Sequence, residues 1–514
     1  MAKYIKITQD NTHTENVTSD VIERLYNYCV GGIEDNSNII GKVKTTYAYD
    51  DECKYLTNKF SDFSIMVGEY YARITDDAAR TIILSKWGES DGKHVLASKL
   101  ATVNSLESVF ANTSIKDAKW LSYFTKVTNL SHTFSGVTST TLDGLEKLDT
   151  SMVTNMQNTF DSCKMTKLDV SGWDVSHVTS MSGMFANIAA EELDLTSWNI
   201  SSITDKTGMF YGARNLKEIK GFESCNISTI GYMMFNGCTN LALTSLPEGV
   251  TSIGYAAFAS CTSLALTSLP EGVTGIGALT FNDCTNLALT SLPEGVTSIG
   301  GSAFNGCTNL ALTSLPEGVT SIGNYAFASC TSLALTSLPE GVTSIGDRAF
   351  SGCTNLALTS LPEGVTSIGG SAFASCTSLA LTSLPEGVTS IGGGAFNNCT
   401  KCLFKSDALK NVKSFNIGAN TGGGFDSDYF ENRQLILGEN CVEINIRCFR
   451  YAHVDKVKIL ATTPPALGDK YAFYGDKGEY MQIYVPDASV DTYKTANVWK
   501  DIAGYIHPMS EWTD

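Results

Sequence analysis

The sequence predicts a mainly β solenoid, and three observations carry that prediction. Seven nearly identical units of 23 residues follow one another between about Leu241 and Thr400, each with the run Leu-Thr-Ser-Leu-Pro-Glu-Gly-Val. A phenylalanine recurs every 24 to 26 residues from Phe110 to Phe235, and every 23 residues from Phe258 onward. Charged residues make up only 17% of the chain, which favours a folded β protein over a disordered tail. A fixed period of this size is typical of short units that stack and bury each other's apolar faces.

The composition excludes several classes of partner. A formal net charge of -17 over 514 residues argues against nucleic acid, whose phosphates would repel the chain. The sequence contains no run of 18 apolar residues, so we expect no membrane span. It also shows no Sec-type signal peptide, and we therefore expect the protein to stay in the cell that makes it unless it leaves within a larger particle.

The period divides the chain into four expected domains. Residues 1–98 do not repeat and are typical of a small N-terminal α+β domain, with a helix expected over Asp76–Lys86. Residues 99–235 carry the longer repeats, and residues 236–404 carry the array of 23-residue units. Residues 405–514 hold degenerate repeats and a C-terminal cap, because an open solenoid edge needs a terminal unit that prevents pairing with other chains.

Eight of the fifteen cysteines recur once per unit, three residues after a phenylalanine. This spacing favours a core position in which a small apolar side chain points inward, and we expect a column of free thiols rather than disulfides or a metal site. The eight are Cys238, Cys261, Cys284, Cys307, Cys330, Cys353, Cys376 and Cys399.

The repeated glutamate after each proline must form one acidic column from Glu248 to Glu386. Such a column can attract cations or a basic patch on a partner, but a solvated stripe that keeps the array soluble is the favoured interpretation. The Thr and Ser side chains in neighbouring columns can bond from coil to coil and stiffen the array.

Variation among the seven units is concentrated in the two residues after the Ile-Gly step and in those after Phe. Under a functional interpretation this column is the recognition surface, because aromatic and cationic side chains anchor many interfaces. The alternative, which we favour on the sequence alone, is that these are unconstrained solvent-facing turns. The candidate ligand-binding residues are Tyr255, Asn324, Tyr325, Asp347 and Arg348.

The sequence contains few residues in a recognisable catalytic pattern. The sequence lacks HExxH and GxSxG motifs, and its six histidines are scattered without a pair at ligand spacing. We therefore predict no enzyme, no catalytic residues, no metal and no cofactor. A solenoid offers a long ordered surface more often than a deep pocket, so binding is the expected function.

Three stretches resemble one family. Residues Leu315 to Leu333 resemble the BspA-like leucine-rich repeat, and the LDxxxW phrases ending at Trp173 and Trp198 look like its companion repeat in bacterial surface proteins. The ending with Thr463-Pro-Pro, Tyr484-Val-Pro and an expected closing helix at Val490–Trp499 is similar to the usual C-terminus of that family. The resemblance implies a leucine-rich-repeat solenoid with short convex turns or helices and a role in adhesion.

Relatives of this kind normally carry a secretion signal, and the sequence shows none. The leading hypothesis is therefore a bacteriophage tail protein for host attachment, located in the virion. Its N-terminal domain would bind other virion or tail proteins, and its repeats would bind a bacterial surface glycan or protein, in a homo-oligomeric or multi-copy assembly. The alternatives are a BspA-like adhesin on a bacterial cell surface and a structural spacer in a virion.

Overall fold

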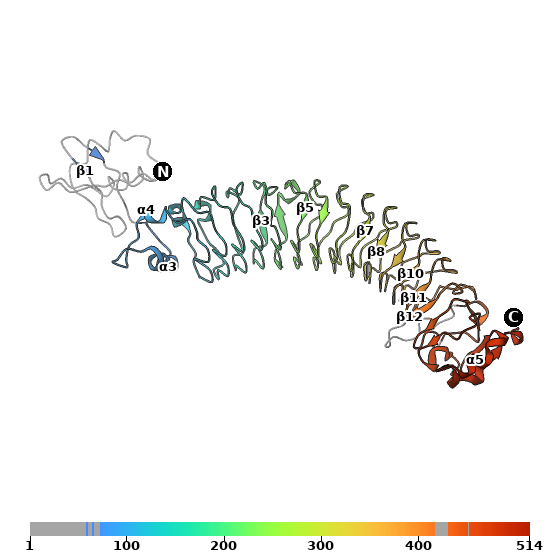
Figure 1. Ribbon diagram of the computed structural model, residues 1–514. Coiled ribbons are helices and arrows are strands. Elements are labelled where there is room, and N and C mark those ends of the chain that lie inside the picture. Colours follow the sequence, from blue (N-terminus) through green and yellow to red (C-terminus); the bar gives the residue numbers. More distant parts are fainter. Residues whose placement is uncertain (1–57, 60–63, 66–71, 417–429, 451, 514) are drawn as a thin grey trace. The chain divides into compact units, whose positions relative to one another are not determined.

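The computed structural model describes residues 58–59, 64–65, 72–416, 430–450 and 452–513 (Figure 1). These residues form two compact units, Met1–Asp205 and Lys206–Asp514. Both are built from stacked coils, about 13 in all, which confirms the predicted leucine-rich-repeat solenoid. Most of the expected N-terminal domain lies outside the described residues, so its fold and its role as a particle anchor stay predictions, as do the four domain boundaries.

In the first unit, α3 (Asp77–Trp87) confirms the helix expected there. It begins after Asp76, whose side chain accepts a hydrogen bond from the amide of Ala79, and ends at Gly88. A short helix, α4 (Ala97–Leu100), leads into the first coils. No described helix is long and apolar enough to cross a lipid bilayer.

The strands are short, as expected for coils that turn every few residues. In the first unit they are β1 (Asn58–Lys59), β2 (Ser64–Ile65) and β3 (Glu192–Asp194). In the second unit they are β4 (Glu218–Lys220), β5 (Thr229–Ile230), β6 (Ser252–Ile253), β7 (Ser298–Ile299), β8 (Ser321–Ile322), β9 (Ser344–Ile345), β10 (Ser367–Ile368), β11 (Ser390–Gly392), β12 (Ser414–Asn416), β13 (Gln434–Leu437), β14 (Glu443–Ile444), β15 (Lys456–Ile459), β16 (Ala466–Leu467), β17 (Gln482–Val485) and β18 (Ile506–Pro508).

The main sheet of the second unit is parallel and runs in the order β7-β8-β9-β10-β11-β12-β14-β16. Each Ser-Ile strand pairs with the same residues of the next coil, so the serines form one row and the isoleucines another. Successive residues of a strand point to opposite faces, which buries Ile and leaves Ser outside. The second unit of the array has Gly275 where the others have Ser, and only single bridges link Ile276 to the neighbouring coils.

Stacked phenylalanine rings form the centre of the repeat array. Successive ring centroids are 5.6 Å apart from Phe258 to Phe281 and 5.5 Å apart from Phe281 to Phe304, with nearly parallel planes. All three side chains are fully buried. The single interior row predicted from the period is therefore confirmed.

The first unit has a row of stacked rings of its own, in which Phe134 and Phe160 are 5.5 Å apart. Here the LDxxxW phrase adds a second aromatic layer, because the buried Trp173 ring lies 5.5 Å from Phe160. The indole NH of Trp173 donates to the carbonyl of Leu145, 3.2 Å away. The hydrogen bond satisfies the polar atom of an otherwise apolar core residue.

The array cysteines line the core beside the phenylalanines. The thiol of Cys307 donates to the carbonyl of Phe281 in the preceding coil at 3.0 Å, and Cys330 donates to Phe304 in the same way. All eight side chains are buried, and none forms a disulfide. The column of thiols inferred from the spacing is thus present, and each thiol joins one coil to the one before it.

The C-terminal cap contains a second parallel sheet, β13-β15-β17-β18. The closing helix was expected to reach Trp499, but α5 (Val490–Thr495) is shorter, so this prediction is wrong beyond Thr495. The backbone of Val498 is left-handed, with φ at 63°, and a separate helical turn begins at Trp499. The Trp499 indole NH donates to the carbonyl of Pro465 at 2.8 Å. This hydrogen bond holds the Trp499 side chain against the segment that contains Pro465.

Candidate ligand-binding groove

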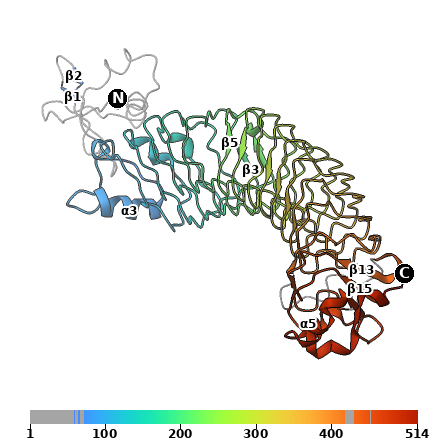
Figure 2. The same cartoon turned by 45° about the vertical axis from the view of Figure 1, so that its right-hand side comes forward.

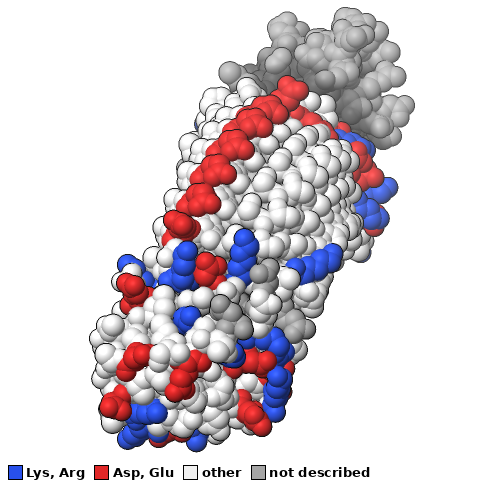
Figure 3. Space-filling view, turned by 90° about the vertical axis from the view of Figure 1, so that its right-hand side faces the viewer, with Lys and Arg blue, Asp and Glu red and all other residues white. Residues whose placement is uncertain are grey.

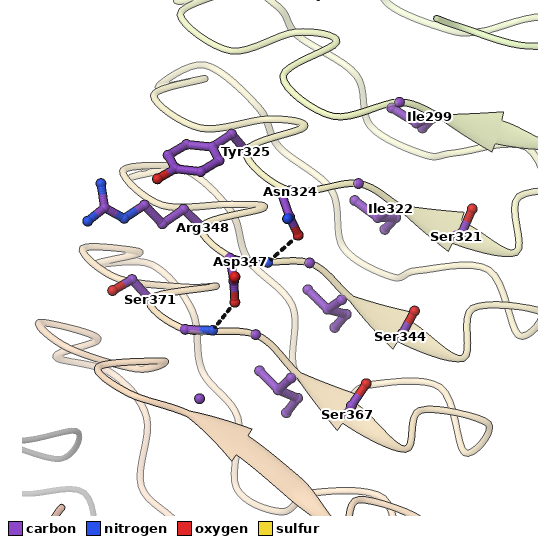
Figure 4. A pocket seen from close by; sticks show the side chains of 18 of the residues that line it. Ile299, Ser321, Ile322, Asn324, Tyr325, Ser344, Asp347, Arg348, Ser367 and Ser371 are labelled. Atoms are coloured by element: carbon purple, nitrogen blue, oxygen red, sulfur yellow. Dashed lines mark hydrogen bonds between the residues drawn. The ribbon is translucent and has the colours of Figure 1, made fainter. Parts of the chain in front are cut away.

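A groove of about 1360 Å³ runs across the coils of the second unit, on the face that carries β7 to β11. It is lined by the Ser-Ile-Gly segments of successive coils, from Ile276 to Gly393 (Figure 4). The isoleucine side chains point into the core and are only 2–3% exposed, so they contribute mainly backbone to the groove. The groove surface is therefore mostly hydroxyl and backbone.

Glycine after each Ser-Ile pair lets neighbouring coils approach closely at the groove. A Cβ atom at Gly346 would lie 2.6 Å from the amide nitrogen of Asn324, and one at Gly369 would lie 2.5 Å from that of Asp347. Real Cβ atoms do not come this close to backbone. The amide of Gly369 also donates to the carbonyl of Ile345 at 2.8 Å, so the close approach is part of the ladder between coils.

The serine hydroxyls of the strands form a row along this groove. Their side chains are exposed or half-buried, and none makes a hydrogen bond to another described residue. The threonine one position earlier behaves differently, because the Thr297 and Thr366 hydroxyls donate to a threonine carbonyl in the preceding coil. The expected coil-to-coil bonding thus holds for these threonines and fails for the serines. The serines of the row are Ser298, Ser321, Ser344, Ser367 and Ser390.

Four of the five candidate residues from the sequence line the groove, and two of them, Asn324 and Asp347, are structural as well. The side-chain oxygen of Asn324 accepts from the amide of Asp347 at 2.9 Å. Asp347 accepts from the amide of Gly370 at 2.6 Å (Figure 4). These bonds extend the ladder between coils past the end of each strand, which leaves only part of each side chain for a ligand.

Tyr325 and Arg348 are the two large side chains at the groove. Both are exposed, and the Arg348 guanidinium lies 5.4 Å from the centre of the Tyr325 ring (Figure 4). Both residues have left-handed backbone, with φ at 59° and 53°. A non-glycine residue in this conformation costs about 1 kcal/mol or more, and other coils meet the same cost at this position, for example at Leu279 and Ser302.

Tyr255, the fifth candidate, does not line the groove. It occupies the column of Asn324 and not that of Tyr325, and its ring stacks on Tyr232 in the preceding coil at 5.3 Å. Both rings are more than two-fifths exposed. The pair forms a separate aromatic patch on an earlier part of the array.

The predicted acidic column is present and exposed throughout (Figure 3). It forms the continuous line of acidic side chains along the array in this view. Its members are Glu248, Glu271, Glu294, Glu317, Glu340, Glu363 and Glu386. None of them lines the groove, so the column does not supply ligand contacts there.

The array ends at a Cys-x-x-Cys pair, Cys399 and Cys402, although no metal site was expected from the sequence on the ground that such a pair is absent. Both side chains are buried, and neither forms a disulfide. A hydrogen bond between the two thiols raises the pKa of Cys399 and lowers that of Cys402. Elsewhere in the column burial raises the pKa of Cys238 and Cys376 to about 12, so those thiols stay protonated and are poor nucleophiles or metal ligands.

Among the described residues, no group of three His, Cys, Asp or Glu side chains is arranged to hold a metal ion. The groove contains hydroxyls, one carboxylate, one guanidinium and one phenol. Such a set can hydrogen-bond and stack, which is the chemistry of recognition.

Two stretches of the chain match known families. Residues 297–422 match the family described as BspA type leucine rich repeat region, in six copies. Residues 128–245 match a family described as Mycoplasma protein of unknown function, DUF285. The match to the BspA-type repeat family agrees with the resemblance seen in the sequence. No similar sequence was found among curated proteins.

Several solved structures are similar. A leucine-rich repeat protein from Bacteroides ovatus is 21% identical over 60% of this chain and 81% of its own, with a TM-score of 0.37. A leucine rich cell surface protein from Faecalibacterium prausnitzii is 24% identical over 48% of this chain and 80% of its own, with a TM-score of 0.28. The pneumococcal vaccine antigen PcpA is 16% identical over 79% and 84%, with a TM-score of 0.30.

Proposed function

We propose that this chain, which carries a BspA-type leucine-rich repeat region, is a non-enzymatic adhesion protein that binds its ligand in the groove of the second unit. The observation that carries the proposal is the placement of sequence variation. Coils that are otherwise nearly identical differ where Asn324, Tyr325, Asp347 and Arg348 reach the groove. An array that only holds other parts apart has no need of an exposed aromatic and an exposed cationic side chain beside one groove.

We place this adhesion protein on a bacterial cell surface, which was the alternative in the sequence analysis. The matched family descriptions name BspA-type repeats and a Mycoplasma protein. A bacteriophage origin, with a tail location and virion partners, finds no support in the comparisons and is not part of the proposal. Partners and assembly state stay predictions.

The first prediction concerns the two large groove side chains. The double variant Tyr325→Gly, Arg348→Gly removes both, and glycine adopts the left-handed backbone at no steric cost. We therefore expect an unchanged fold and a loss of about tenfold or more in affinity, because one aromatic and one cationic anchor are gone. Binding of the labelled full chain to bacteria from a gut community, sorted by fluorescence, measures the effect.

The matched control is Ser329→Gly, Ser375→Gly. These residues are also left-handed, with φ at 61° and 62°, and belong to the same array, but they do not line the groove. We expect this variant to bind like the unchanged protein. Equal binding by the two double variants would refute the proposed site, and failure of the unchanged protein to bind any cells would refute adhesion itself.

A further inference from the structure

The chemical class of the ligand can be inferred from the row of serine hydroxyls; this inference rests on the proposed function. Five hydroxyls in register face the groove, one per coil, and are free of hydrogen bonds to other described residues. Each can donate one hydrogen bond and accept two. Every coil of the row therefore offers a ligand the same hydrogen-bond donor and the same hydrogen-bond acceptor.

The spacing of this row suits a linear polymer with a repeated polar group. Neighbouring strands of a sheet lie about 4.8 Å apart, so a chain laid across the coils meets a hydroxyl at that interval. The interval is close to the length of one pyranose residue in an extended polysaccharide, which displays hydroxyls on every ring. A polysaccharide lying along the row would thus stay in register with it over several residues.

An extended peptide is a poorer match. Peptides that add to a sheet bond to free backbone groups at its edge, whereas the strands that line this groove are internal and pair with coils on both sides. Side-chain specificity in such binding also needs apolar pockets, and the isoleucines of these strands face the core. The described groove therefore offers a peptide neither free backbone groups to pair with nor apolar pockets for its side chains.

The charge of the groove favours a neutral ligand. Arg348 is its one lining cation and Asp347 its one lining carboxylate, and the whole chain carries a net charge of -17. A polyanion would be repelled by such a chain. The exposed ring of Tyr325 adds an apolar face on which the C–H side of a sugar ring can pack.

We infer that the groove binds a neutral linear polysaccharide whose chain runs across the coils along the row from Ser298 to Ser390, beside Tyr325 and Arg348. The contacts are individually weak, and their repetition along one polymer raises the affinity.

The test uses the full-length protein and a panel of hexasaccharides: β-1,3-linked and β-1,4-linked glucose, β-1,4-linked mannose, α-1,6-linked glucose, and hexagalacturonate as a polyanion. We expect calorimetry to detect binding of at least one neutral probe and weaker or no binding of hexagalacturonate. The triple variant Ser321→Ala, Ser344→Ala, Ser367→Ala should bind that probe about tenfold or more weakly.

The control variant is Ser314→Ala, Ser337→Ala, Ser360→Ala, which removes three exposed hydroxyls from another column of the same coils and should bind normally. Circular dichroism checks that both triple variants keep the fold. The inference is overturned if no neutral probe binds, if only hexagalacturonate binds, or if the two triple variants bind equally.

The proposed function can survive that failure. If cells still bind the unchanged protein but not the Tyr325→Gly, Arg348→Gly variant, and protease treatment of the cells abolishes binding, the groove recognises a protein. In that case the adhesion proposal stands and the polysaccharide is wrong.

Discussion

Replacing Gly369 with alanine is expected to destabilise the repeat array strongly. The added Cβ would lie 2.5 Å from both the Asp347 amide nitrogen and the Gly346 carbonyl carbon, and neither backbone atom can rotate away as a side chain could. Relief requires the two coils to separate, which would weaken the hydrogen bond from the Gly369 amide to Ile345 and loosen the packing beneath it. Overpacking of this kind costs on the order of 3 kcal/mol. Urea denaturation followed by circular dichroism measures it.

Gly254→Ala is the matched control for this substitution. Gly254 occupies the same position after Ser-Ile in an earlier coil, but the nearest backbone atoms would be 3.2 Å from its added Cβ. A neighbour needs to give by only a few tenths of an ångström there, so we expect a cost of about 1 kcal/mol or less. Equal destabilisation by the two variants would show that coil separation does not decide the effect.

The two glycines show which features of the array can be predicted from the sequence and which cannot. Gly254 and Gly369 follow the same three residues, Thr-Ser-Ile, and no pattern separates them. The row of phenylalanines could be predicted because it depends only on the period, which every coil repeats. The clearance at each glycine depends on how the backbone of the preceding coil packs against it, and this clearance differs between Gly254 and Gly369 although the three residues before them are the same. Figure 2 gives a second view of this array.

The candidate site was predictable to a similar extent. Comparison of the units identified the variable column, and four of its five named residues do line one groove. Tyr255 was grouped with them because it follows an Ile-Gly step, but the residues that line the groove begin at Ile276, in the next coil. The serine row was not identified because serines repeated in nearly every unit were expected to bond from coil to coil as part of the ladder. The hydrogen bonds separate the two residue types. The hydroxyls of Thr297 and Thr366 donate to the preceding coil, whereas the serine hydroxyls of the row bond to no described residue.

The stability of the second unit is expected to fall steeply above pH 9, because of the buried thiols. Desolvation raises the pKa of Cys238 and Cys376 to about 12, and it holds the pKa of five others in the column, Cys261 to Cys353, well above the ordinary value of 9.0. Between pH 9 and 12 the unfolded chain loses thiol protons and the folded chain keeps them. The folded state therefore binds more protons, and the free energy of unfolding falls as pH rises. Each thiol contributes about 1.4 kcal/mol per pH unit in this window.

Tyrosines and lysines also titrate in this range, so the thiol contribution is isolated with the variant Cys307→Ala, Cys330→Ala, Cys353→Ala. At pH 8 this variant should be less stable than the unchanged protein, since it loses three hydrogen bonds to phenylalanine carbonyls and the packing of three sulfur atoms. Its loss of stability from pH 9 to pH 10 should nevertheless be smaller, by about 3 kcal/mol if the column unfolds as one cooperative unit and by less if coils unfold in groups. Urea midpoints at pH 8, 9 and 10, measured anaerobically with a reductant, give both quantities. Parallel pH profiles for the two proteins would mean that the thiols ionise in the folded state, and hence that water reaches a core whose rings and thiols pack in continuous rows.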